Sequence, residues 1–489
     1  MDESVETNDM HPDELRRHAH AVADWIADFV GRVEDLPVLA KVRPGEVSAQ
    51  LPARAPEHGE SMDTILADFD RLIVPATTHW NHPGFHAYFS NTGSGPGILA
   101  ETLIATLNDN AMLWRTGPAA TELELRTCSW VRDLLGIPER FEGHIEDTAS
   151  TSTLVALAAA RHRITDGAVR EKGLAGRPPL RVYCSEEAHS SVERACIVLG
   201  LGVEGCRRVA VDDDFRLDPA TLRAAIAEDR VHGVVPMAVV ATTGTTSTTS
   251  VDPVAAIADV CAEEGLWLHV DAAYGGAMAA SERFRWVLDG VDRADSLVVN
   301  PHKWLFVPMD CSVLLYRDAS AFRAAFSLVP PYLMTPEDDV ARNLMDYGVA
   351  LGRRFRSLKL WFVLRWFGRD RIAALIEHHV DLAAVFAGWI DASEDWERLV
   401  PAPMSTVLYR HVPPAMAGDE DALRAHNTAI MDRLNEDGRS FVSHTVVQRG
   451  GDPRFALRMA VGNARTQRRH VEDLWERLQR IAGEVATTA

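Results

Sequence analysis

Between about residue 95 and residue 320, short apolar segments alternate with helix-like segments. This alternation constrains the possible folds more than any other feature of the chain. The apolar segments are rich in Val, Leu and Tyr and span 181–184, 233–242, 266–271, 296–299 and 312–316, with helix-like stretches between them at 190–199, 218–226 and 253–264. Such a pattern predicts an α/β protein whose mostly parallel sheet carries helices on both faces. Ligands on such sheets bind beyond the carboxyl ends of the strands, so functional residues are expected there.

The 489 residues exceed what one compact core usually holds, and three parts are predicted. Residues 1–94 would form a helical arm, in which apolar residues recur at helical spacing (Leu15, Val22, Ile26, Phe29 and Val33). This apolar stripe must be buried, either against the rest of the chain or against a partner subunit. Residues 95–372 would form a large domain. Residues 373–489, where helices mix with short strands, would form a small α+β domain.

Charge and cysteine content narrow the possible partners. Fifty basic and seventy acidic residues give a net charge of −20, which disfavours nucleic acid and anionic membranes as partners. No apolar run approaches the roughly 18 residues that cross a bilayer. Residues 1–6 are acidic, unlike a secretory signal. The six cysteines form no close pair in sequence, which fits reduced thiols and predicts no metal site. We therefore expect a cytoplasmic protein.

The most informative segment is SLVVNPHKWL, residues 296–305, in which a short strand runs into a turn carrying Lys303. A lysine at a strand end among bulky apolar neighbours can lose its charge through desolvation, which leaves a nucleophilic amine for Schiff-base chemistry. A surface lysine lying beside Trp304 is the simpler interpretation, and Lys303 alone would favour it.

A second segment, LWLHVDAAYGG at residues 266–276, strengthens the chemical interpretation. An apolar strand ends in Asp271, and the small Ala273 follows. A buried carboxylate there can keep a pyridine nitrogen protonated, and Ala273 leaves room for a flat ring; pyridoxal phosphate (PLP) needs both. Asp271 could instead cap a helix. His269 and Asp271 could also bind a metal, but no further Cys or His cluster supports zinc.

Two hydroxyl-rich segments could hold a phosphate. Residues 147–153 (DTASTST) lead into an alanine-rich helix, whose first N–H groups and dipole favour an anion. Residues 241–246 (ATTGTT) follow a strand and could reach the same anion. Either segment could be ordinary capping and turn chemistry. His189, after another strand, could stack on a cofactor ring or cap the helix that follows.

Together these segments resemble the group II PLP-dependent amino-acid decarboxylases, particularly the aromatic-L-amino-acid decarboxylase branch. The likeness covers nearly the whole chain and includes THWNHP at 78–83, HSSVERA at 189–195, NPHKW at 300–304 and LGRRFRSLK at 351–359. The resemblance implies a fold-type-I enzyme (PLP-dependent transferase-like), with an N-terminal helical arm, a seven-stranded sheet in the large domain and a small C-terminal domain. It also implies a homodimer with active sites shared between subunits.

The resemblance assigns roles to individual positions. Lys303 resembles the lysine that forms the Schiff base with PLP, Asp271 the partner of the pyridine nitrogen, and His189 the histidine stacked on the ring. Tyr332 resembles the tyrosine that returns a proton to the substrate carbon, and it lies in a Pro-rich, acidic stretch at 330–339 with the composition of a mobile lid. The remaining cofactor contacts implied are Thr148, Ala149, Ser150, Thr246, Ala273, Asn300 and His302.

The implied reaction is decarboxylation of an L-amino acid to its amine and CO2, with the substrate set by pocket residues. Trp80, Tyr88 and Phe89 match the aromatic branch. Polar or adaptable residues stand where that branch usually has Pro, Thr, Ile and Phe, namely Ser90, Asn91, Asn110 and Met112. Gly352 leaves room for a large ring. Polar groups in an apolar pocket favour a substrate with its own hydroxyl or ring nitrogen, so Trp, Tyr, dihydroxyphenylalanine, Phe and His all stay open.

Other readings remain. A decarboxylating aldehyde synthase, which consumes oxygen, typically has Phe at the loop tyrosine, so Tyr332 argues against it. Decarboxylation of a non-aromatic amino acid is a further alternative. An aminotransferase usually has a dedicated arginine for the substrate carboxylate. A scaffold protein with lost chemistry would not need Lys303, Asp271, His189 and Tyr332 together.

Overall fold

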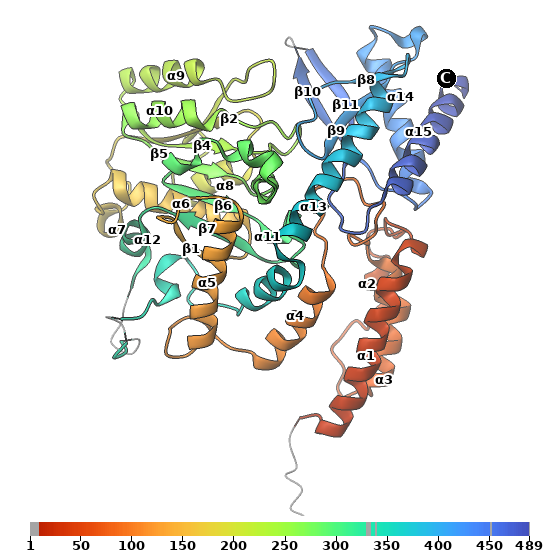
Figure 1. The fold of residues 1–489 in the computed structure, drawn as a ribbon, viewed down its shortest axis with the longest axis horizontal. Coiled ribbons are helices and arrows are strands. Elements are labelled where there is room, and N and C mark those ends of the chain that lie inside the picture. Colours follow the sequence, from red (N-terminus) through yellow and green to blue (C-terminus); the bar gives the residue numbers. More distant parts are fainter. Residues whose placement is uncertain (1–8, 329–333, 338–339, 450–451, 489) are drawn as a thin grey trace, which may run out of the picture.

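The computed structural model describes residues 9–328, 334–337, 340–449 and 452–488 of the chain (Figure 1). Its centre is a seven-stranded sheet in the order β1-β7-β6-β5-β4-β2-β3. The strands are β1 (Glu142–Glu146), β2 (Leu180–Ser185), β3 (Cys206–Val209), β4 (Val235–Thr242), β5 (Trp267–Asp271), β6 (Ser296–Val299) and β7 (Ser312–Tyr316). β7 runs antiparallel to both neighbours, and the other pairs are parallel. The predicted α/β class and mostly parallel seven-stranded sheet are confirmed.

Helices cover both faces of this sheet, as Figure 1 shows. The helices of this part of the chain are α4 (Gly95–Leu107), α5 (Pro118–Leu134), α6 (Ala149–Ile164), α7 (Val169–Lys172), α8 (Ser191–Val198), α9 (Pro219–Val231), α10 (Val254–Glu264), α11 (Pro301–Trp304) and α12 (Ala319–Phe326). Successive strand residues point to opposite faces. Leu268 and Val270 of β5 therefore enter one apolar core, while Trp267 enters the other. Burial on both faces explains why the central strands read as continuous apolar runs.

A second sheet, in the order β10-β11-β9-β8, is antiparallel throughout. Its strands are β8 (Trp396–Arg398), β9 (Thr406–His411), β10 (Ser443–Arg449) and β11 (Asp452–Ala460), and the helices α14 (Glu420–Glu436) and α15 (Arg468–Thr488) pack with it around a separate core. The long helix α13 (Ser357–Asp391) runs from the large sheet to this small one (Figure 1). α13 is kinked at Gly368, where φ is 63° and ψ 175°.

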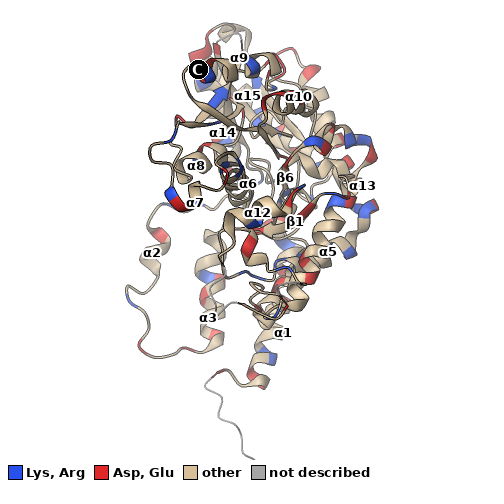
Figure 2. Cartoon of the chain, turned by 90° about the vertical axis from the view of Figure 1, so that its left-hand side faces the viewer, with Lys and Arg blue, Asp and Glu red and all other residues tan. Residues whose placement is uncertain are grey.

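The N-terminal helices α1 (Pro12–Arg32), α2 (Glu46–Gln50) and α3 (Met62–Asp68) form an arm that extends away from the body in both views (Figures 1 and 2). The α-helix α3 ends at Asp68, and the chain continues as a π-helical turn over Phe69–Ile73. Several apolar arm residues stay exposed, including Leu15 at 57% and Ile65 at 47%. The apolar stripe predicted for the arm is therefore only partly covered within one chain.

The distribution of charge and the apolar character of α13 bear on possible partners. Figure 2 shows basic and acidic residues distributed over both the arm and the body. By length and composition alone, α13 could cross a membrane. It is broken at Gly368, however, and packs against α4 and α5, as a core helix does.

Candidate active site

A cavity of about 280 Å³ opens where β4, β5 and β6 end at their carboxyl termini. Mostly parallel sheets bind their ligands beyond the carboxyl ends of the strands. Fourteen of the residues predicted from the sequence line it together: Trp80, Tyr88, Phe89, Asn91, Thr148, Ala149, Ser150, His189, Thr246, Asp271, Ala273, Asn300, His302 and Lys303. Residues as far apart in the chain as Trp80 and Lys303 thus meet at one site.

Lys303 lies in the short helix α11 that follows β6, beside the fully buried Trp304. Its Nζ lies 5.3 Å from the centre of the Phe89 ring. Burial lowers the pKa of Lys303, the charge of Asp271 opposes that shift, and Arg458 adds to it. The environment therefore favours the uncharged amine, which is the nucleophilic form.

Asp271 ends β5 and is only 5% exposed. Its Oδ1 accepts the backbone N–H of Ala273 at 3.1 Å, which fixes the carboxylate at the cavity wall. The negative charge of Asp271 raises the pKa of Lys303 and of His189 against the lowering effect of burial. One carboxylate therefore acts electrostatically on both neighbours across the cavity.

His189 follows β2, and part of its surface is exposed in the single chain. Its Nδ1 accepts the N–H of Ser191 at 3.1 Å, so the capping role and the place on the cavity wall occur together. Burial lowers the pKa of His189, which favours the neutral ring. With Nδ1 as acceptor, the neutral ring carries its proton on Nε2.

One end of the cavity suits an anion. Thr148, Ala149 and Ser150 form the N-terminus of α6, where the first N–H groups have no partner within the helix. Thr246 reaches the cavity from the loop after β4. These donors fit the phosphate of PLP.

Unsatisfied polar atoms give a second test of fit. Asn300 Oδ1 and Thr242 Oγ1 are buried without a hydrogen-bond partner, and both residues line the cavity. Buried polar atoms are normally paired, so these two indicate a polar ligand. His302 is already engaged, because its Nδ1 accepts the N–H of Cys311 at 3.0 Å, and burial lowers its pKa to about 4. The residues present therefore fit PLP.

Aromatic rings form the side of the cavity toward the substrate. Trp80 stacks on Phe85 at 4.3 Å and lies 5.9 Å from Tyr88, and Phe89 stacks on Tyr274 at 3.7 Å. Asn91 also lines the cavity, and its Nδ2 donates to Met309 Sδ at 3.7 Å.

Ser90 differs from its neighbours on this wall. It is buried outside the lining set, with its Oγ unpaired. In the single chain Ser90 therefore lies behind the cavity wall, and its contact with substrate stays a prediction.

Three predicted pocket residues do not line this cavity in the single chain. Asn110 and Gly352 share a separate cleft, where Asn110 Oδ1 accepts the N–H of Arg353 at 3.0 Å. Met112 packs with Leu113 and Met345. A single chain therefore does not bring these residues to Lys303. Tyr332 lies outside the described residues.

Sequence reasoning missed several residues. Thr242, Gly244, Tyr274 and Met309 also line the cavity, and the first three adjoin motifs that were recognised. Arg458, from β11, is buried beside the site: its Cζ lies 4.8 Å from the centre of the Phe89 ring, and its Nη1 donates to the Ala87 carbonyl oxygen at 2.9 Å. No local motif marks Arg458, because its position depends on how the two sheets meet.

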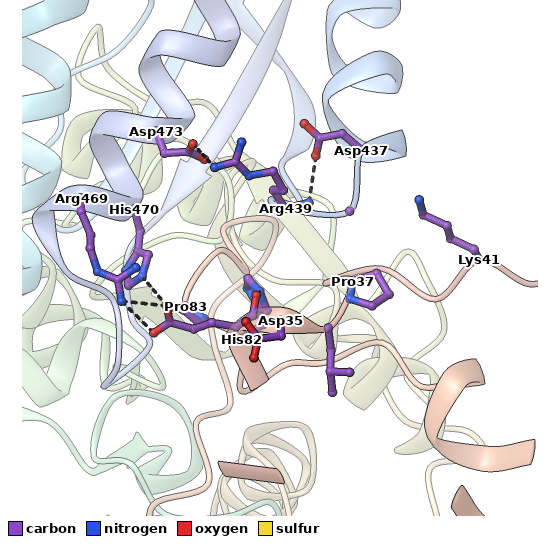
Figure 3. Close-up of a pocket in the computed structure, with 13 residues that line it drawn as sticks. Asp35, Pro37, Lys41, His82, Pro83, Asp437, Arg439, Arg469, His470 and Asp473 are labelled. Carbon is purple, nitrogen blue, oxygen red and sulfur yellow. Dashed lines mark hydrogen bonds and ion pairs between the residues drawn. The ribbon is translucent and has the colours of Figure 1, made fainter. Parts of the chain in front are cut away.

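A larger cleft of about 610 Å³ lies where the arm meets the C-terminal domain (Figure 3). Its charges neutralise one another: Arg469 and His470 contact Glu34 at 2.7 and 3.4 Å, and Arg439 pairs with Asp473. Paired charges of this kind join two segments and leave little to bind a ligand. Across the described parts of the chain, no group of His, Cys, Asp and Glu could hold a metal ion.

Comparisons with known proteins agree with this geometry. The family model described as "Pyridoxal-dependent decarboxylase conserved domain" matches residues 44–412. The chain is 36% identical to phenylacetaldehyde synthase of Arabidopsis thaliana, covering 97% of this chain and 96% of the relative. It is 37% identical to tyrosine decarboxylase 4 of Petroselinum crispum, covering 96% and 94%. The crystal structure of Oryza sativa TDC with PLP and tryptamine matches with a TM-score of 0.93 at 36% identity, over 98% of this chain and 99% of that one.

Proposed function

The chain belongs to the pyridoxal-dependent decarboxylase family, and we propose that it converts an aromatic L-amino acid to its amine and CO2. One observation carries the proposal: Lys303, with a lowered pKa, and the buried Asp271 line one cavity walled by Trp80, Tyr88 and Phe89. In this proposal Lys303 and Asp271 bind PLP, and the aromatic wall contacts the substrate ring. Relatives of both the decarboxylase and the aldehyde synthase kind have similar identity, so sequence distance does not separate these two outcomes.

When bound, PLP supplies an electron sink for the charge left on the substrate carbon as CO2 departs. Lys303 would attach the cofactor through its uncharged amine. Asp271 would hold a proton at the pyridine nitrogen. The N-terminus of α6, with Thr246, would hold the phosphate and so fix the ring in the cavity.

The remaining residues orient the substrate and exclude water. His189 presents Nε2–H on the cavity side that Nδ1, bound to Ser191, leaves free. Trp80, Tyr88 and Phe89 exclude water beside the substrate ring, which strengthens the electrostatic effect of Asp271. Tyr332, or a group that it positions, would return a proton to the substrate carbon.

The active unit would be a cytoplasmic homodimer built from the three domains predicted above. Asn110, Met112 and Gly352 would then complete the pocket of the partner subunit. An apolar groove of about 880 Å³ supports dimerisation: Ile26 and Val30 of the arm face Leu99 and the α13 residues Trp361 and Trp366 across it. Leu99 is 65% and Trp366 64% exposed in one chain, and exposed apolar patches of this kind mark interfaces. The six free cysteines fit a reducing compartment.

Substituting Trp366→Glu tests the dimer. A charge placed in a dry interface should raise the dimer dissociation constant by at least about tenfold, whereas the exposed position leaves the fold of one chain intact. Val231→Glu, at a position 85% exposed, is the matched control. Light scattering would show whether W366E shifts toward the 53.9 kDa chain mass while V231E does not. A wild-type protein that is monomeric at micromolar concentration would reject the proposal.

The reaction itself can be read from its products. PLP-loaded protein would be incubated in air with a mixture of L-Trp, L-Tyr, L-Phe, L-His and L-dihydroxyphenylalanine, and products followed by mass spectrometry with a peroxide assay. We expect one aromatic amine without peroxide. Dominant aldehyde and peroxide would establish the aldehyde synthase instead. An amine from a non-aromatic amino acid added in a second mixture would move the substrate outside the aromatic class.

The control for this assay separates turnover at the cavity from background chemistry of free PLP. Lys303→Ala should lower turnover by at least about a thousandfold, because it removes the nucleophilic amine. Lys172→Ala, on the exposed face of α7, should retain full activity. Equal activity of both variants would show that the reaction does not use this site.

A further inference from the structure

Three cysteines that are separate in the sequence meet in space. Cys184 lies on β2, Cys196 on α8 and Cys206 on β3, and the Sγ atoms of Cys184 and Cys206 are 3.7 Å apart although 22 residues separate them in the chain. All six cysteines fall within the described residues, and all are free thiols. The sequence interpretation of scattered cysteines is correct along the chain, but folding gathers half of them into one cluster. The proposed function makes no use of this cluster.

Cys206 has the exposure that a reactive thiol needs. It is partly exposed on β3, the edge strand of the large sheet, whereas the other five cysteines are buried. A solution oxidant can therefore reach Cys206 first. Cys184 and Cys196 lie behind it, each fully buried.

The charge around the cluster also favours a thiolate at Cys206. Thiol donors from Cys184 and Cys196 lower the pKa of Cys206 against the opposing effect of burial, and the guanidinium groups of Arg208 and Arg181 lower it further. Hydrogen bonding to Cys206 correspondingly raises the pKa of Cys184. The cluster therefore pairs one thiolate with a neighbouring thiol.

The remaining cysteines have the opposite environment. Burial raises the pKa of Cys261 to about 12 and that of Cys311 to about 12, and it raises the pKa of Cys128 as well. Because the thiolate is the nucleophile, these three should be inert.

We propose that Cys206 is a peroxide-reactive site and that Cys184 is its resolving cysteine. The Cys206 thiolate attacks one peroxide oxygen, the O–O bond breaks, and Cys206 becomes a sulfenic acid while hydroxide leaves. The Cys184 sulfur then attacks the Cys206 sulfur, a disulfide forms, and water leaves with the proton of the Cys184 thiol. In sum, two thiols and one hydrogen peroxide give one disulfide and two waters.

The strand pairing supports Cys184 as the partner. Cys206 is opposite Val182 in the β2–β3 register, and Cys184 is opposite Arg208, so the two cysteines are diagonal neighbours on adjacent strands. Closing their sulfurs from 3.7 Å to the roughly 2.05 Å of a disulfide requires a local shift. β3 has a strand neighbour on one side only, which makes it the element that can move.

The test uses the full-length protein with hydrogen peroxide, an alkylating quench and peptide mapping without reductant. We expect a linked pair of peptides containing Cys184 and Cys206, two hydrogens lighter than the separate peptides, that dithiothreitol separates. Without peroxide, limited iodoacetamide should label Cys206 at least about tenfold faster than any other cysteine.

Variants identify each role. Cys184→Ser should leave a sulfenic acid at Cys206 that dimedone traps, and Cys206→Ser should abolish the linked peptides. Cys261→Ser is the control and should link as the wild type does. The proposal fails if wild-type Cys206 is labelled no faster than Cys128, Cys261 and Cys311, or if peroxide links Cys206 to Cys196 instead of Cys184. The labelling rates need no variant, so they remain decisive if C206S does not fold.

Discussion

At the scale of single residues, Asp271 and Lys303 act on each other across the cavity. Burial removes the stabilisation that water gives to the lysine charge, and the carboxylate restores part of it. The balance lowers the pKa of Lys303 and favours the uncharged, nucleophilic amine. Arg458 shifts the balance toward the uncharged amine from the side of the C-terminal sheet.

Asp271→Asn should separate cofactor attachment from turnover. The amide cannot keep the pyridine nitrogen protonated, so we expect turnover to fall by at least about a hundredfold while the cofactor still attaches to Lys303. Absorbance of bound PLP and steady-state kinetics would measure the two effects. Asp318→Asn, at the exposed N-cap of α12, is the control and should change neither. Wild-type turnover in D271N would remove Asp271 from the chemistry.

The residues that the sequence predicted to meet at the cavity lie at or near the end of a strand. Asp271 is the last residue of β5, and Lys303 and His189 lie a few residues after β6 and β2, so local pattern and topology suffice to predict that they meet. Arg458 could not be found in this way, because it meets Lys303 only through the packing of β11 against the large domain. In the proposed dimer, Asn110 and Gly352 would contribute from a second subunit, which no pattern within one chain can locate.

At the scale of elements, α13 joins the two sheets through one residue with a left-handed φ. Gly368 has φ 63° and ψ 175°, a combination open essentially to glycine alone. No atom lies within 4 Å of the position that a Cβ would occupy there, so a substitution would act through backbone strain and not through a clash.

Gly368→Ala should therefore destabilise the protein by about 1–3 kcal/mol. Gly388→Ala is the matched control in the same helix: a Cβ there also meets nothing within 4 Å, but the backbone is helical. We expect G388A to stabilise by about 0.5–1 kcal/mol, since alanine loses less backbone entropy. Denaturant unfolding would measure both. Equal free energies of unfolding for the two variants would refute the role assigned to the kink.

Strand prediction succeeded in the centre of the sheet and failed at its edges. β4, β5, β6 and β7 are buried on both faces and read as apolar runs. β3 (CRRV) does not, because an edge strand tolerates charge: Arg207 contacts Asp229 at 2.9 Å and Arg208 contacts Glu193 at 3.2 Å. β1 (EGHIE) was missed because its buried His144 and Glu146 satisfy each other at 3.0 Å.

At the scale of the whole molecule, buried histidines make stability depend on pH. Burial lowers the pKa of His86, His269 and His302 to about 4 and that of His379 to about 3. In the unfolded chain these groups titrate near 6.5. Between about pH 6.5 and pH 4 the unfolded chain therefore binds more protons, and stability falls as pH falls.

The melting temperature should consequently drop steadily from pH 7 to pH 5. Each such histidine contributes up to about 1.4 kcal/mol per pH unit in this window. Asp252, with a pKa raised by burial to about 7, and Glu187, whose pKa burial also raises, oppose the trend. His379→Gln removes one titrating ring and should flatten the dependence. A melting temperature that is equal or higher at pH 5 would contradict the assignment of neutral buried histidines.

The proposed active site requires one covalent link, between Lys303 and PLP, and the most direct measurement looks for that link. Protein loaded with PLP would be reduced with borohydride, digested and mapped by mass spectrometry. We predict that the reduced cofactor is carried by the peptide containing Lys303, at about one per chain, and that Lys303→Ala carries none. Cofactor on another lysine, such as Lys359 or Lys172, or no retained cofactor at all, would contradict the assignment of this cavity as the active site.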